Sequence, residues 1–109
     1  MNTKTPESWQ SDSNTRDVFI ELSAEKSLML PFDHFMFAEL KNGDRHQTLR
    51  LVFVTHEVFI SGHSLRRIAV AIQRRELCWL AKSTSRTEHS EGQSVILEIN
   101  VREAEYITS

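Results

Sequence analysis

The sequence has few of the residues that build covalent crosslinks, metal clusters and phosphate-binding loops. Cys78 is the only cysteine among 109 residues, so the chain can form neither an internal disulfide nor a cysteine-based zinc cluster. With three glycines and no glycine-rich motif, a loop that cradles phosphates is not expected. A single cysteine is typical of a reducing compartment, and we predict a cytoplasmic protein.

Long apolar runs and a strong charge imbalance are also missing. No stretch approaches the ~18 apolar residues of a membrane span, and the N-terminal residues include no apolar signal segment. Thirteen basic and 15 acidic residues give a formal net charge of −2, so the chain as a whole does not favour phosphate binding. We therefore expect a soluble protein without a membrane partner, in which any nucleic-acid surface is a local cluster.

The apolar residues that are present are enough for one core. Hydrophobic residues make up 39% of the chain and charged residues 26%, a composition typical of a globular domain. Residues 1–16 are polar apart from Trp9, and we expect a disordered tail followed by a single domain over residues 17–109. Trp9 would then be either a stray exposed aromatic or a hook that docks on the body or on a partner.

Most of the domain has the residue pattern of β-strands. Strands are expected at 17–22, before Pro31, and at 35–40, 47–55, 57–62, 77–81 and 94–101. Between 64 and 76 the apolar period becomes that of an amphipathic helix, with Ser64 as the expected N-cap. This order predicts an α+β domain with a mostly antiparallel sheet of five to six strands and the helix packed on one face.

The predicted sheet carries more apolar residues than one helix can cover. Met36, Phe37, Val52, Val54 and Phe59 belong to both faces of their strands. The surplus could be covered by the segment around 28–32, by the C-terminal residues or by a second copy, and the last option predicts a homodimer through sheet packing. The alternative is that strand twist and loops close a barrel within one chain.

The predicted helix is rich in arginine. Its four arginines are Arg66, Arg67, Arg74 and Arg75. Such a face is usually a solvated surface, but arginine is also enriched in protein interfaces and contacts the phosphates of nucleic acids. The arginines are therefore candidates for an interaction surface.

Two histidines and a glutamate suggest a metal site, but their spacing argues against one. His56 and His63 would lie ~20 Å apart on a straight strand, whereas the ligands of one metal lie within a few ångströms of each other. We predict no metal and no cofactor, and only His56, Glu57 and His63 are weak candidates. No nucleophile elbow, metalloprotease or nucleotide-binding motif occurs, so we expect no enzyme activity.

The leading hypothesis is a small non-enzymatic protein-interaction module that self-associates and binds an unidentified protein partner. The helix arginines and Phe59 are the residues expected to make these contacts. The first alternative is a nucleic-acid-binding domain that uses the same arginines, with help from Trp79. The second is a small-ligand or metal-binding domain that uses His56, Glu57 and His63.

Overall fold

The computed structural model describes residues 8–83 and 93–104, which form strands around one α-helix. The strands are β1 (Trp9–Ser11), β2 (Asp17–Ser23), β3 (Lys26–Pro31), β4 (Phe35–Asn42), β5 (Gln47–Phe53), β6 (His56–His63), β7 (Leu77–Ala81) and β8 (Val95–Glu103). The helix α1 spans Arg66–Gln73, and a short 3-10 turn, η1, spans Phe32–His34. The structure is an α+β fold, as the sequence predicts.

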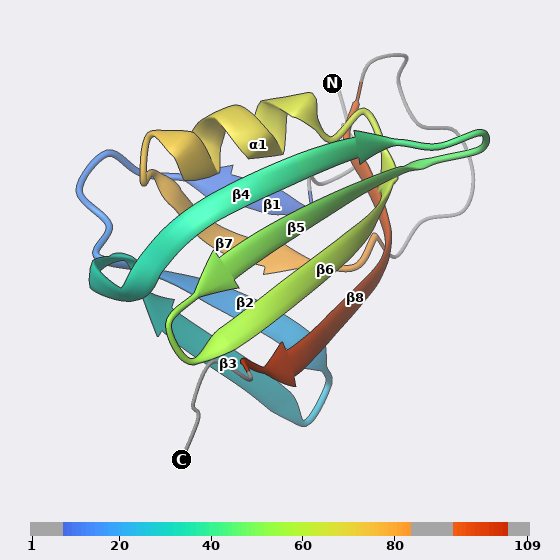
Figure 1. Ribbon diagram of the computed structural model, residues 1–109. Coiled ribbons are helices and arrows are strands. Elements are labelled where there is room, and N and C mark those ends of the chain that lie inside the picture. The colour runs from blue at the N-terminus through green and yellow to red at the C-terminus, as the bar shows by residue number, and fades with distance from the viewer. Residues whose placement is uncertain (1–7, 84–92, 105–109) are drawn as a thin grey trace, which may run out of the picture.

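The strands form two four-stranded sheets that face each other (Figure 1). One sheet has the order β1-β7-β2-β3 and the other has the order β4-β5-β6-β8. Neighbouring strands are antiparallel except β2 and β7, which run parallel. The prediction of one five- to six-stranded sheet is therefore wrong in its arrangement.

The chain moves from one sheet to the other at Pro31. This residue ends β3, η1 turns the chain, and β4 then begins in the second sheet at Phe35. Proline has no backbone donor and is found at strand ends and edges. The ring centroids of Phe32 and Phe35 lie 6.3 Å apart, and those of Phe35 and Phe53 lie 5.3 Å apart. This aromatic cluster packs at the corner where the chain passes from one sheet to the other.

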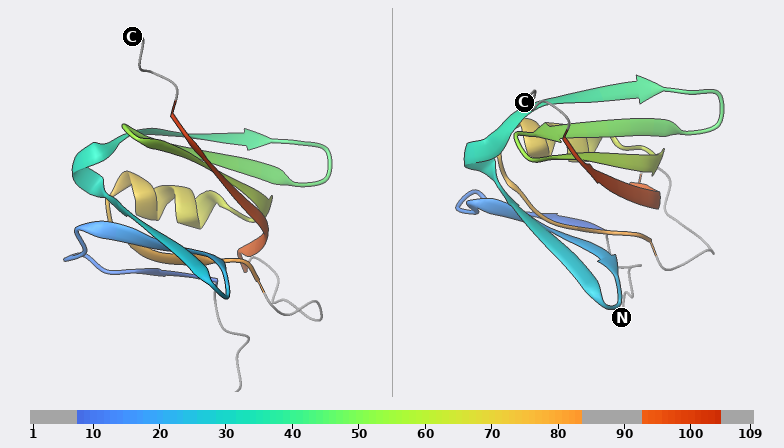
Figure 2. Two further views of the ribbon diagram at one scale, coloured as in Figure 1. Left: turned by 90° about the horizontal axis from the view of Figure 1, so that it is seen from below. Right: turned by 60° about the horizontal axis from the view of Figure 1, so that its bottom comes forward.

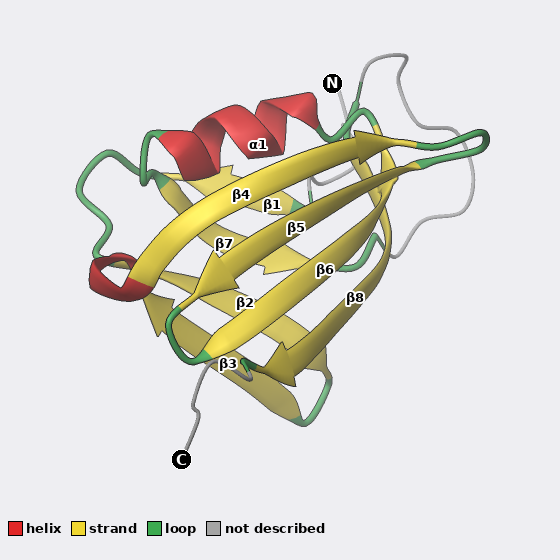
Figure 3. Ribbon diagram, viewed as in Figure 1, coloured by secondary structure: helices red, strands yellow, loops and turns green. Residues whose placement is uncertain are grey.

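Helix α1 lies along one side of the sandwich, between the two layers, rather than over the face of a sheet (Figures 2 and 3). Its inward side chains, Ile68, Ala71 and Ile72, are buried in the common core. The apolar stripe predicted from the helical period therefore closes one open side of the sandwich. The core-facing residues of each sheet are covered mainly by the other sheet, not by the helix.

Both ends of α1 depend on residues that the sequence pattern does not reveal. Ser64 is not the N-cap, because it has a left-handed φ of 56° and the cap residue is Leu65. The Leu65 N–H donates to Oε1 of Gln47, on β5, at 2.7 Å. At the other end, Arg75 has a φ of 57° and the Glu76 N–H donates to the carbonyl of Ala71 at 2.9 Å, which forms a Schellman motif. This motif turns the chain sharply from α1 into β7.

Part of the segment expected as a disordered tail is a strand. Trp9–Ser11 pairs antiparallel with β7, and the Asp12 N–H donates to the carbonyl of Glu76 at 2.7 Å. Trp9 also packs against the hydrophobic core. Backbone pairing and one aromatic anchor thus order a stretch whose composition is polar. Residues 1–7 of the expected tail lie outside the described residues.

Candidate interaction site

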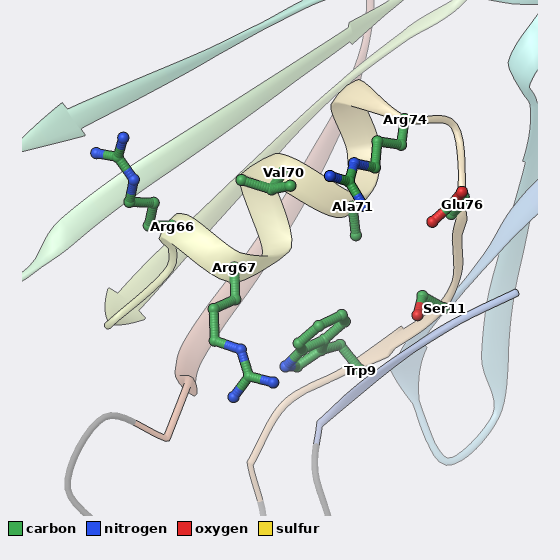
Figure 4. A pocket seen from close by; sticks show the side chains of 8 residues that line it. All are labelled: Trp9, Ser11, Arg66, Arg67, Val70, Ala71, Arg74 and Glu76. Atoms are coloured by element: carbon green, nitrogen blue, oxygen red, sulfur yellow. The ribbon is translucent and has the colours of Figure 1, made fainter. Parts of the chain in front are cut away.

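A groove of about 370 Å³ runs between α1 and β1 (Figure 4). It is lined by side chains from β1, from the exposed side of α1 and from the turn into β7. These residues are Trp9, Ser11, Arg66, Arg67, Val70, Ala71, Arg74 and Glu76. We call this the α1–β1 groove.

The helical repeat places Arg67 and Arg74 on one side of α1. Residues three, four and seven apart share a helix face, so Arg67, Ala71 and Arg74 follow one another along the groove. Ile68 and Ile72 point into the core, and Ala71, which is also buried, lies where the core-facing side of the helix meets the groove. Pairing of β1 with β7 then brings Trp9 beside the helix. The groove is therefore a product of helix period and strand pairing together.

No described carboxylate forms an ion pair with the arginines of the α1–β1 groove. Ion pairs within the described residues involve Arg50 and Arg102, and none joins Arg66, Arg67 or Arg74 to a described carboxylate. The Arg67 guanidinium lies 5.6 Å from the centroid of the Trp9 ring, where the cation meets the π face. The arginines therefore border the apolar floor of the groove, which Val70 and Ala71 form.

The Trp9 ring that lines the groove also carries a buried donor. The indole Nε1 of Trp9 is buried and has no hydrogen-bond partner among the described residues. A buried donor left unpaired costs about 1–3 kcal/mol. Guanidinium groups are donors only, so a ligand that contacts the arginines of this groove has to supply acceptors. Carboxylate oxygens together with an aliphatic side chain match both the donors and the floor.

The structure separates Arg75 from the other three helix arginines. The left-handed residue at the end of α1 points this side chain to the far side of the helix, where its guanidinium lies 5.7 Å from the Phe35 ring centroid. There it lines a second groove with residues that include Phe37 and Ala69. The sequence candidates Arg66, Arg67 and Arg74 thus form one cluster, and Arg75 is not part of it.

The outer face of the β4-β5-β6-β8 sheet carries the other arginine cluster, and it is neutralised within the chain. Glu57 is only 5% exposed and accepts from Nη2 of Arg102 at 3.1 Å, while Nε of Arg50 lies 3.5 Å from the same oxygen. The Arg102 guanidinium lies 5.1 Å from the Phe59 ring centroid. Val52 on this face is fully buried. Arginine side chains therefore lie over Phe37 and Phe59, whereas Met36, Phe37 and Val54 of the predicted apolar surplus remain about half exposed.

The weak metal candidates are not brought together. His56 and His63 lie at opposite ends of β6, and His56 Nδ1 is 2.8 Å from Oγ1 of Thr55. Glu57 is engaged by the arginines on the outer face. Within residues 8–83 and 93–104, no group of three or more side chains is placed to hold a metal ion.

Cys78 is partly exposed on β7. Burial raises the pKa of its thiol, and the nearby negative charge of Asp12 raises it further. A raised pKa keeps the thiol protonated at neutral pH, which is the reverse of what an activated nucleophile requires.

Trp9 is the site residue that sequence reasoning placed in a tail. Its only signal is an isolated tryptophan in a polar stretch, which fits the interpretation of Trp9 as a hook.

The chain matches no protein-family model, no curated protein and no solved structure at a significant level. In the part of the chain that the structure describes, no helix is long and apolar enough to cross a membrane.

Proposed function

We propose that this protein is an interaction module that binds an acidic, partly apolar segment of a partner protein in the α1–β1 groove. The observation that carries the proposal is the difference between the two arginine clusters. Arg50 and Arg102 are paired with Glu57, whereas Arg67 and Arg74 border an apolar floor and pair with no described carboxylate. An acidic segment would supply the negative charge that Arg67 and Arg74 lack as a partner.

An acidic peptide fits the groove better than a nucleic-acid strand. Single-stranded nucleic acids bind by stacking bases on exposed aromatic faces, but Arg67 lies over the Trp9 ring. The floor beside it, Val70 and Ala71, is aliphatic and suits an aliphatic side chain. The volume of about 370 Å³ lies within the usual range of ligand pockets.

The proposal can be tested through the fluorescence of Trp9. The chain has two tryptophans, so Trp79→Phe leaves Trp9 as the only one. This protein is titrated with a blocked peptide of alternating glutamate and leucine, with the matching lysine–leucine peptide, and with oligothymidine. We expect the glutamate–leucine peptide alone to change the Trp9 emission, and we expect its binding to weaken as salt is added.

Arginine variants assign the binding to the groove. Arg67→Ala and Arg74→Ala are each expected to weaken peptide binding about fivefold, because each removes a charge-assisted contact worth roughly 1 kcal/mol. Arg45→Ala is the matched control, since Arg45 is exposed in the turn between β4 and β5. Binding of oligothymidine that depends on Arg67 and Arg74 would favour the nucleic-acid alternative. A peptide affinity that the groove variants leave unchanged would overturn the proposal.

A further inference from the structure

The four edge strands of the two sheets differ in how they are protected. β1 has only three residues, and β4 is flanked by α1. β3 begins at Lys26 and ends at Pro31, residue types that discourage pairing at an edge. β8 has nine residues, contains neither lysine nor proline, and is the last strand of its sheet (Figure 1). Among the described residues it is the longest of the four edge strands.

Register shows which backbone groups of β8 point outward. The Ala104 N–H donates to the carbonyl of Thr55 at 2.9 Å, so Ala104 faces β6. In an antiparallel ladder this orientation alternates, which turns residues 98, 100 and 102 toward β6 and residues 99, 101 and 103 away from it. No described residue outside β8's own sheet bonds to the backbone of Ile99 or Val101.

Neighbouring groups set the limits of the part of the β8 edge, around Ile99 and Val101, whose backbone points outward. At the N-terminal end, Ser83 covers the edge, because its N–H donates to the Ile96 carbonyl and its hydroxyl accepts from the Ile96 N–H, both at 2.9 Å. Beyond Ile96 the edge borders a groove of about 450 Å³ that Leu22, Leu28, Ile99 and Val101 help to line. All four are partly buried apolar residues. A strand added here would gain both hydrogen bonds and apolar cover.

We propose that two copies of this chain pair antiparallel through β8, with Asn100 facing its counterpart across a two-fold axis. In this register Ile99 lies opposite Val101 of the second copy, so their outward backbone groups exchange hydrogen bonds. Glu98 then lies opposite Arg102 of the second copy, whose side chain contacts Glu57 of its own chain but is still 67% exposed, and the symmetry repeats this charge pair. The two β4-β5-β6-β8 sheets become one continuous sheet.

The charges select this register over its neighbours. With the axis at Val101, Asn100 would face Arg102 and Ile99 would face Glu103, which forms no charge pair. With the axis at Ile99, Arg102 would reach Ile96, whose edge Ser83 already covers. The proposed dimer is edge to edge, unlike the face-to-face packing predicted from the sequence. It is independent of the α1–β1 groove.

Single cysteines on β8 test the register directly. In a Cys78→Ser background, Asn100→Cys puts two thiols opposite each other, with Cα atoms ~4.5–5.5 Å apart, within disulfide range. Glu98→Cys is the matched control on the same face of the strand, and its two copies would lie ~13 Å apart. Under mild oxidation we expect the Asn100→Cys protein to run as a crosslinked dimer and the Glu98→Cys protein to remain monomeric in a non-reducing gel. Equal crosslinking of the two would overturn the register.

Sedimentation of the unmodified protein tests the dimer itself. We expect a dimer whose dissociation constant rises about tenfold or more with Glu98→Arg, because that arginine faces Arg102 in both symmetric pairs. Asp44→Arg makes the same change in charge at an exposed turn, and it should leave the dimer intact. A monomer at every accessible concentration overturns the proposal. So does a dimer that Glu98→Arg leaves unchanged and that does not crosslink through Asn100→Cys.

Discussion

Arginine occurs in two clusters on this molecule, and the neighbours of each cluster determine what its members can do. Arg50 and Arg102 share the buried carboxylate of Glu57. Arg67 and Arg74 have no such partner among the described residues and border an open groove. The sequence identifies the helix arginines as candidates but cannot rank them, because Arg102 lies 45 residues from Glu57 in the chain. Pairing between such distant residues depends on strand register, which no local pattern encodes.

Gly62 is the residue at which close packing of backbones is most demanding. It lies at the irregularity between β6 and β8, where a Cβ atom would overlap the carbonyl oxygen of Val95. Because the obstacle is backbone, it cannot rotate away, and Gly62→Ala is expected to lower the free energy of unfolding by about 3 kcal/mol. Urea denaturation measures this loss. The adjacent Ser61→Ala serves as the control and should change stability by less than about 1 kcal/mol. Equal losses in the two variants would contradict the packing argument.

At the level of elements, the sequence predicts the position of the α-helix and of most strands, and it misses the contacts that other elements make with their ends and edges. The apolar period locates α1 and the alternating patterns locate most strands, because burial of one face imposes that spacing. Ser64 has the residue type of an N-cap but a left-handed backbone, and the acceptor for Leu65 comes from Gln47 on a different element. β1 was missed because its polar residues are ordered by β7.

The start of α1 should therefore depend on Gln47. Gln47→Ala removes the acceptor for the Leu65 N–H and is expected to lower the free energy of unfolding by about 1 kcal/mol, the usual cost of losing a helix cap. Gln47→Glu keeps an acceptor oxygen for Leu65 but loses the Nε2 donor to Asn42 Oδ1, an exposed bond, so it should lie between Gln47→Ala and the wild type in urea denaturation. If Gln47→Glu loses as much as Gln47→Ala, the bond to Leu65 is not what matters at this position.

At the scale of the whole molecule, the division into two sheets was beyond the reach of pattern reasoning. The periodicity of each strand shows that one face is buried, but it does not show whether a helix or a second sheet covers that face. Pro31 marks the break between β3 and β4, yet only the contacts of Phe32 with Phe35 and Phe53 show that the break is a corner between layers. The parallel pairing of β2 with β7 joins segments about 60 residues apart.

The corner predicts that the two sheets unfold as one unit. Both tryptophans, Trp9 and Trp79, belong to the β1-β7-β2-β3 sheet, so their fluorescence follows that sheet, whereas far-UV circular dichroism follows both. Because one core is shared, we expect the two signals to give coincident urea transitions. Phe53→Ala in the other sheet should remove about 4 kcal/mol and shift both signals together. A fluorescence transition that stays in place while the dichroism shifts would show that the layers are independent.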